Sequence, residues 1–194
     1  MKRVCVFAGS NVGTSLEYEL AAVKLGQEIA SRKLELVYGG SKIGLMGRIA
    51  DTVLQEGGTV IGVMPRNLFQ GEMVHNGLSE LHEVDGMHER KALMTKLTDG
   101  YIALPGGLGT YEELFEVLSW SQIGIHKKPV GVLNVHGFYE PLVAMLKQTV
   151  EAGFMRETNL GLLLVESEAD KLLARMAGYT PPIQTNKWSE MPQN

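Results

Sequence analysis

Residues 104–113, Leu-Pro-Gly-Gly-Leu-Gly-Thr-Tyr-Glu-Glu, have the composition of an anion-binding turn followed by a helix. Glycines after a strand let the backbone turn tightly and bring its N–H groups close to a bound anion. A helix that begins at such a turn adds unsatisfied N–H groups and the positive end of its dipole. The Thr110 hydroxyl can add another donor. We therefore predict a phosphate site here, rather than a simple turn with a threonine cap.

Two familiar nucleotide fingerprints are absent from this junction. A dinucleotide site has the pattern Gly-x-Gly-x-x-Gly, but Glu112 stands where the last glycine should be. A P-loop has Gly-Lys followed by Ser or Thr, and the chain contains no such string. The pattern therefore favours a monophosphate over the pyrophosphate of NAD or a triphosphate.

Charged side chains near the junction are candidates for chemistry. Glu112 and Glu113 fall in the first turn of the predicted helix, where acids are common for dipole reasons alone. Beside a phosphate they would have to point elsewhere, towards a sugar or a water. Arg90 and Lys91 interrupt the apolar face of another predicted helix, and buried cations need partners, although a lysine can also snorkel to the edge. Arg90 is a better candidate than Lys91 for a functional role, because a guanidinium group can bind a carboxylate or phosphate through two nitrogens.

Other reactive residues do not form a site. Ser10 and Ser41 lack the strand–elbow–helix context of a hydrolase nucleophile. The histidines are scattered without the spacing of metal ligands, so we expect no metal site: His75, His82, His88, His126 and His136.

Short apolar runs alternate with amphipathic stretches and must position these residues. The predicted strands are residues 3–8, 34–38, 59–64, 101–104, 130–134 and 162–165, and a short strand is expected near 80–84. The predicted helices are residues 16–31, 45–55, 87–98, 110–122, 138–151 and 168–176. Apolar strands without alternation are typical of a sheet covered on both faces. The predicted fold is a single α/β, Rossmann-like, doubly wound domain with a mainly parallel sheet flanked by helices.

Three glycine-rich loops follow predicted strands, at residues 9–14, 39–44 and 106–110. Ligands of such folds bind at the carboxyl ends of the strands, so we expect these loops to converge on one rim of the sheet. Residues 1–179 are expected to form the domain, with a long connection at 65–86, and residues 180–194 to form a proline-containing tail.

The predicted helix at 110–122 is apolar on two sides. Glu113, Val117 and Trp120 lie roughly opposite the main stripe, which is formed by Tyr111, Leu114, Phe115 and Leu118. A helix that is apolar on two sides is buried on two sides. We therefore predict that a partner subunit covers the second side, in a homodimer with the active site near the interface.

The composition of the 194 residues is that of an ordinary globular protein, with 44% hydrophobic and 21% charged residues. A net charge of −4 argues against a nucleic-acid-binding protein. The apolar run after Met1 is too short for a signal peptide, and no stretch is long enough for a membrane helix. The single Cys5 cannot form an internal disulfide, so we expect a soluble, cytoplasmic protein.

Three motifs resemble those of one family. They are YGGxxxGLMG at 38–47, MHxRK at 87–91 and PGGxGTxxE at 105–113, and the stretch 124–131 also looks like the family. They strongly resemble the LOG ("lonely guy") family of cytokinin riboside 5'-monophosphate phosphoribohydrolases, long mislabelled as lysine decarboxylases. The similarity covers nearly the whole chain, from residue 4 to about 165.

The resemblance implies hydrolysis of the N-glycosidic bond of an adenosine monophosphate, which releases free base and ribose 5-phosphate without a cofactor. It implies that Arg90 and Glu113 are the catalytic pair. Ser119 stands where members usually have Thr, and Ser41 stands where many have a third glycine. The substrate contacts that the resemblance implies are Glu72, Lys91, Gly107, Leu108, Gly109, Thr110, Tyr111, Glu112 and Ser119. It also implies a homodimer.

Two other functions compete with this hypothesis. A lysine decarboxylase needs pyridoxal phosphate on a lysine, for which the chain offers no second domain to build a cofactor cleft. A non-catalytic carrier of a nucleotide or cofactor could use the same anion turn. The pair of Glu113 with Arg90 favours catalysis, because a phosphate carrier gains little from an acid beside the anion. Neither the role of Arg90 nor the base of the substrate is decided by the sequence.

Overall fold

The computed structural model describes residues 1–66 and 74–182, and its sheet has seven parallel strands. The strand order is β4-β3-β2-β1-β5-β6-β7, so the chain winds outward in one direction from β1 and in the other from β5. The strands are β1 (Arg3–Phe7), β2 (Glu35–Tyr38), β3 (Val60–Pro65), β4 (Glu80–Val84), β5 (Gly100–Ala103), β6 (Val130–Leu133) and β7 (Leu163–Glu166). This topology confirms the predicted doubly wound α/β fold. Its switch point lies between β1 and β5, where ligands of such folds bind.

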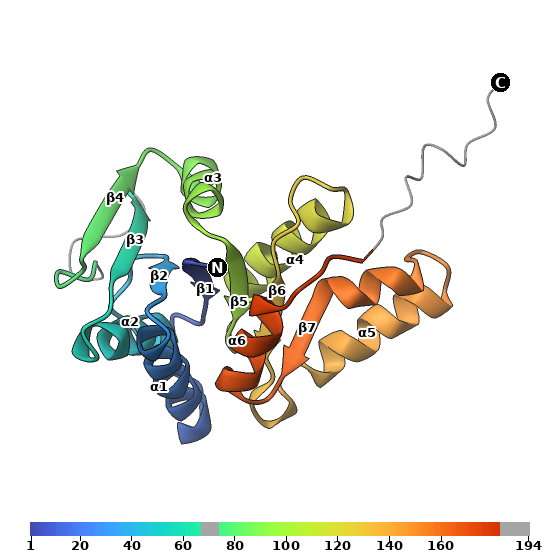
Figure 1. Ribbon diagram of the computed structural model, residues 1–194, viewed down its shortest axis with the longest axis horizontal. Helices are drawn as coiled ribbons and strands as arrows, with labels where there is room; N and C mark the ends of the chain where they lie inside the picture. The colour runs from blue at the N-terminus through green and yellow to red at the C-terminus, as the bar shows by residue number, and fades with distance from the viewer. Residues whose placement is uncertain (67–73, 183–194) are drawn as a thin grey trace.

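Helices cover both faces of the sheet, and each face has its own hydrophobic core (Figure 1). The helices are α1 (Leu16–Ser31), α2 (Gly44–Gln55), α3 (Met87–Leu97), α4 (Leu108–Gln122), α5 (Glu140–Glu151) and α6 (Ala169–Ala177). One core joins α1, α2 and α6 to the sheet, and the other joins α3, α4 and α5 to the opposite face. Short 3-10 turns, Val135–Gly137 and Glu157–Leu162, precede α5 and β7. None of the described helices is long and apolar enough to cross a membrane.

The elements agree with the predicted ones in kind and order, and the differences are at their ends. The helix α4 begins at Leu108 rather than at Thr110, so the exposed Gly109 lies in its first turn. The strand β4 is exposed at Glu80, Leu81 and Glu83, as expected of a strand at the edge of the sheet. The predicted tail, residues 180–194, lies mostly outside the described residues.

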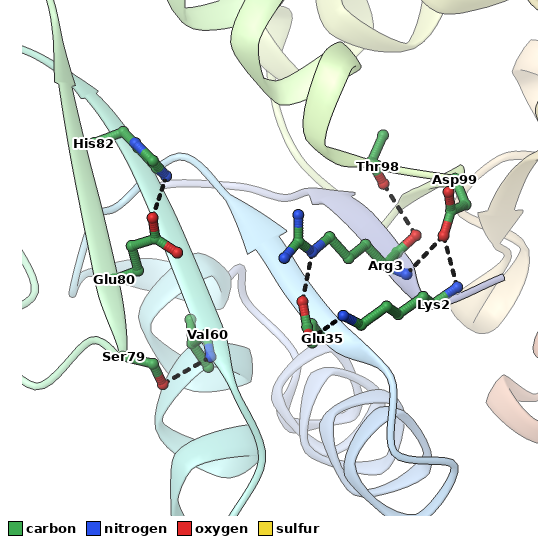
Figure 2. A network of polar contacts seen from close by, with 9 residues as sticks. All are labelled: Lys2, Arg3, Glu35, Val60, Ser79, Glu80, His82, Thr98 and Asp99. Carbon is green, nitrogen blue, oxygen red and sulfur yellow. Dashed lines mark hydrogen bonds and ion pairs between the residues drawn. The ribbon is translucent and has the colours of Figure 1, made fainter.

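Polar contacts hold the amino-terminal ends of the central strands together (Figure 2). The carboxylate of Asp99 accepts hydrogen bonds from the backbone N–H groups of Lys2 (2.6 Å) and Arg3 (2.9 Å). Arg3 also pairs with Glu35 at the start of β2, and Thr98 donates to the Arg3 carbonyl at 3.2 Å. These contacts tie β1 to β2 and to the segment before β5, at the end of the sheet opposite the predicted site.

Candidate active site

The three glycine-rich loops meet at the carboxyl ends of β1, β2 and β5, as predicted. The Gly9 N–H group donates to the Pro105 carbonyl at 3.1 Å, and the Leu45 N–H group donates to the Gly9 carbonyl at 3.0 Å. Gly44 has a left-handed φ of 63°, and a Cβ there would lie under 3.0 Å from the backbone of Ser10. The loops therefore pack backbone against backbone, which only residues without side chains allow.

The turn before α4 exposes the amino-terminal end of that helix. The N-cap residue is Gly107, no side chain caps the helix, and Gly107, Leu108 and Gly109 are all exposed. The first N–H groups of a helix have no partner within the helix, so they are available to an anion. We call residues 105–110 the anion loop. Thr110 is 4% exposed, and its hydroxyl lies against Gly106 inside the turn rather than at the surface.

Arg90 lies buried across the carboxyl ends of the strands, with 8% of its surface exposed. Its Nε donates to the Val63 carbonyl at the end of β3, at 3.1 Å. Its Nη1 lies 3.6 Å from Oε1 of Glu113 on α4 and 3.9 Å from the sulfur of Met87. The structure thus brings together the two residues that the sequence predicted as the catalytic pair.

Glu113 is a buried carboxyl group beside a cation, with 12% of its side chain exposed. Burial raises the pKa of Glu113 to about 7, and the Arg90 guanidinium counteracts part of that rise. A carboxyl group that titrates near neutral pH can exchange a proton or change its charge during a reaction. This is the electrostatic property that a catalytic acid or base needs.

Lys91 pairs with two other acids of α4. Its Nζ donates to Glu112 at 2.6 Å and to Glu116 at 2.9 Å, and 15% of its side chain is exposed. Burial lowers the pKa of Lys91, but the two carboxylates more than offset this and raise it. Because Glu112 pairs with Lys91 and Glu113 with Arg90, neither acid is left to repel a bound phosphate.

The side of α4 that we assigned to a partner subunit packs largely against its own chain. Val117 is 2% exposed and belongs to the core of its own chain, and Trp120 packs against the same core. Glu113 faces Arg90 on α3. Burial of Glu113 and Val117 is therefore provided by the same chain, and the partner subunit stays a prediction.

The remaining predicted contacts are spread around the site. Tyr111 is half-buried in the first turns of α4, and Ser119 is exposed further along the helix, away from the Arg90–Glu113 pair. Glu72 lies outside the described residues. Residues that the sequence did not suggest include Val63, which contributes only its carbonyl, and Glu116, which pairs with Lys91. Glu116 is one helical turn from Glu112, and this spacing is a signal that could have identified it.

The described residues form little enclosed space next to the pair. A cavity of about 10 Å³ lies beside Glu113 and Lys91, far below the several hundred Å³ that ligand sites usually enclose. A larger cavity of about 460 Å³ lies between α1 and the start of α6. Its lining acids include Glu28 and Glu168, whose side chains are 35% and 55% exposed. Glu113 is only 12% exposed, and it is therefore the stronger candidate for chemistry.

Comparison with known proteins shows the family of the chain. Residues 46–176 match the family model described as "possible lysine decarboxylase". The chain is 46% identical over 180 residues to cytokinin riboside 5'-monophosphate phosphoribohydrolase LOG1 of Arabidopsis thaliana, a match that covers 93% of this chain and 84% of that protein. A probable enzyme of the same name from Oryza sativa subsp. japonica, LOGL1, is 48% identical, over 92% of this chain and 80% of that one.

The chain belongs to the LOG family. These LOG relatives are named phosphoribohydrolases and not decarboxylases, despite the description of the family model. Among solved structures, the molybdenum cofactor carrier protein of Chlamydomonas reinhardtii has a TM-score of 0.68 and 20% identity, over 91% of this chain and 96% of that one. The molybdenum cofactor binding protein of Rippkaea orientalis has a TM-score of 0.68 and 21% identity, over 92% and 97%. At these identities the two structures show that the fold is shared, and no more.

Proposed function

We propose that this LOG-family chain hydrolyses the N-glycosidic bond of N6-modified adenosine 5'-monophosphates to free base and ribose 5-phosphate. The observation that carries the proposal is the buried pair of Arg90 and Glu113, 3.6 Å apart, next to the exposed start of α4. The LOG relatives are named for this activity, and the matches with this chain cover most of the length of each relative. A carrier of a phosphate compound would have no use for a buried acid beside the anion.

The proposed mechanism assigns one task to each part of the site. The N–H groups of the anion loop bind the 5'-phosphate and fix the ribose. As the bond between C1' and the base breaks, positive charge develops on the sugar, and the ionised Glu113 stabilises it or orients the attacking water. The water oxygen bonds to C1', and a proton from that water balances the charge of the departing base. Arg90 favours the ionised form of Glu113 and orients the carboxylate.

The reaction needs no cofactor in this proposal, since every step uses the chain's own groups and water. We also infer a cytoplasmic location. The one cysteine, Cys5, is fully buried and unpaired, as is usual for proteins of a reducing compartment.

We further propose a homodimer whose interface lies on the side of α4 and α5. The helix α5 has no fully buried residue, although it is amphipathic. Large apolar side chains are exposed on α5 and in the turns that follow α4 and α5. They are Ile123, Ile125, Met145 and Phe154. If these side chains form one apolar patch, a second subunit would cover it. A second subunit would also supply walls that the described residues of one chain do not provide around Glu113.

The reaction is tested by identifying its products. Purified protein is incubated with an N6-modified AMP and with the matching nucleoside, in the presence of a chelator and without added cofactor, and the products are separated by chromatography. We expect equal amounts of base and ribose 5-phosphate from the nucleotide and far less base from the nucleoside. If the nucleotide binds but stays intact, the protein is a carrier.

A further inference from the structure

Gly39, the first residue after β2, lies where any side chain would collide with Arg90. A Cβ built on Gly39 would lie under 3.0 Å from Nη2 of Arg90, and 3.3 Å from both Cζ of Arg90 and the sulfur of Met46. Gly39 is buried, and its φ is not in the left-handed range, in contrast to Gly40 with a φ of 81°. Alanine could therefore adopt the backbone conformation of Gly39. Position 39 therefore requires glycine for lack of space, because the Arg90 guanidinium occupies the place where a Cβ would lie.

The guanidinium of Arg90 is held on several sides. Its Nε donates to the Val63 carbonyl, Nη2 lies over Gly39, and Nη1 points towards Glu113. The strands β2 and β3 are adjacent and paired in register, with Tyr38 opposite Gly62, so Gly39 and Val63 are neighbours near the carboxyl ends of these two strands. Arg90 thus spans from the ends of two strands to α4, and its reach to Glu113 depends on how closely it can lie against β2.

We propose that Gly39 is a positioning residue for catalysis, which acts by leaving room for the Arg90 guanidinium against the end of β2. This inference rests on the proposed function, in which Arg90 favours the ionised form of Glu113 and orients the carboxylate. The colliding atom is at the far end of a flexible side chain, so an alanine at position 39 would displace the guanidinium without unfolding the protein. Gly39→Ala therefore separates catalysis from stability.

The kinetic test compares Gly39→Ala with the wild type and with Gly178→Ala as a matched control. A Cβ on Gly178 would meet only the Ala174 carbonyl, at 3.9 Å, and Gly178 lies at the end of α6, outside the site. We expect Gly39→Ala to lower kcat about 100-fold, since a displacement of about 1 Å in a site can have an effect of this size. KM should change less than about threefold and the melting temperature should stay near that of the wild type, because the anion loop and the core are untouched. Gly178→Ala should keep the wild-type kcat.

A crystal structure of Gly39→Ala is the second readout, and it is independent of activity. We expect the bond from Arg90 to the Val63 carbonyl to be broken and the guanidinium to lie farther from Glu113. The proposal is overturned if Arg90 keeps its position, if kcat stays within about threefold of the wild type, or if KM rises while kcat holds. If the wild type hydrolyses no nucleotide, the proposed function has failed, whereas the crystal structure still tests whether Gly39 sets the position of Arg90.

Discussion

The pKa of Glu113 is set by the opposing effects of burial and of neighbouring charges. Glu113 interacts electrostatically with Arg90 and Lys91 on α3, with Glu112 and Glu116 on its own helix, and with the buried Cys5 of β1. Burial raises its pKa to about 7, and the two cations lower it. Near neutral pH the group is therefore divided between its acid and its carboxylate form, and only the carboxylate can stabilise positive charge on the sugar.

The pH dependence of turnover should follow this carboxyl group. Because the ionised form is the active one, we expect kcat/KM for an N6-modified AMP to rise as the pH increases through about 7. The measurement is a pH profile from about pH 5 to about pH 9. The nucleotide phosphate titrates near pH 6 as well, so the control is the residual rate of Glu113→Gln, which should lack the limb near 7. A profile that is the same in both proteins would assign that limb to another group.

The exposed start of α4 is expected to bind the phosphate through N–H groups rather than side chains. Leu108 is the first residue of the helix, is 87% exposed, and follows an extended Gly107. Proline is favoured at this position and removes only the N–H group. We predict that Leu108→Pro weakens nucleotide binding about tenfold, the contribution of a hydrogen bond to a charged group.

The matched control for that variant is Leu108→Ala, which shortens the same side chain and keeps the N–H group. Titration of both variants with AMP measures the difference. Equal affinities of Leu108→Pro and Leu108→Ala for AMP would show that this N–H group does not contact the phosphate.

At the other end of the sheet, the Asp99 contacts are expected to contribute to stability alone. Burial raises the pKa of Asp99, but hydrogen bonds from the Arg3 and Lys2 N–H groups lower it below its usual value. The ionised form is thus stabilised in the folded state, so its contribution is present above the unfolded pKa and is lost as the pH falls through the folded one. We predict that Asp99→Ala lowers the free energy of unfolding by about 1 kcal/mol at neutral pH, a value that allows for the exposure of the group.

Urea unfolding measures this difference, with Asp85→Ala as the control. Among the described residues, Asp85 makes only an exposed ion pair with Arg66, at 3.5 Å, and its removal should change stability by less than about 0.5 kcal/mol. Equal losses in the two variants at neutral pH would contradict the role assigned to Asp99.

The elements themselves were largely predictable from the sequence. Apolar runs and helical periodicity located every strand and helix of the described chain in order, and even the short β4 was expected near its observed position. The rotation of α4 about its own axis was not predictable, because a helical wheel with two apolar stripes does not say which stripe faces the sheet. The structure shows Val117 in the core and Glu113 against α3.

The side chains of the candidate site were predictable from the sequence, whereas the contributions of its backbone were not. Arg90 and Glu113 were identified by charge and motif, and the structure pairs them. The Val63 carbonyl has no signature, since every residue has one. The role that we propose for Gly39 depends on the packing of α3 on the sheet, which spacing along the chain does not predict.

For the whole molecule, the proposed dimer makes a prediction about assembly. Ile125 is 63% exposed after α4, and Phe154 is 81% exposed after α5. Placing a charge at both positions should weaken an apolar interface that contains them. We expect the double variant Ile125→Asp, Phe154→Asp to sediment as a monomer and the wild type as a dimer.

Leu16→Asp is the control for that experiment. Leu16 is 67% exposed at the start of α1, which packs on the other face of the sheet. This variant should sediment like the wild type. Loss of the dimer in Leu16→Asp, or its persistence in the double variant, would place the interface elsewhere.

The central claim is that Glu113, paired with Arg90, breaks the glycosidic bond of a nucleotide held by the anion loop. Its most direct test measures nucleotide binding and base release with one preparation of Glu113→Gln, a variant that keeps the size of the side chain and removes its charge. We predict near-normal affinity for AMP and release of base from an N6-modified AMP at least about 100-fold slower than in the wild type. Base release within a few-fold of the wild-type rate would contradict the claim and remove Glu113 from the mechanism.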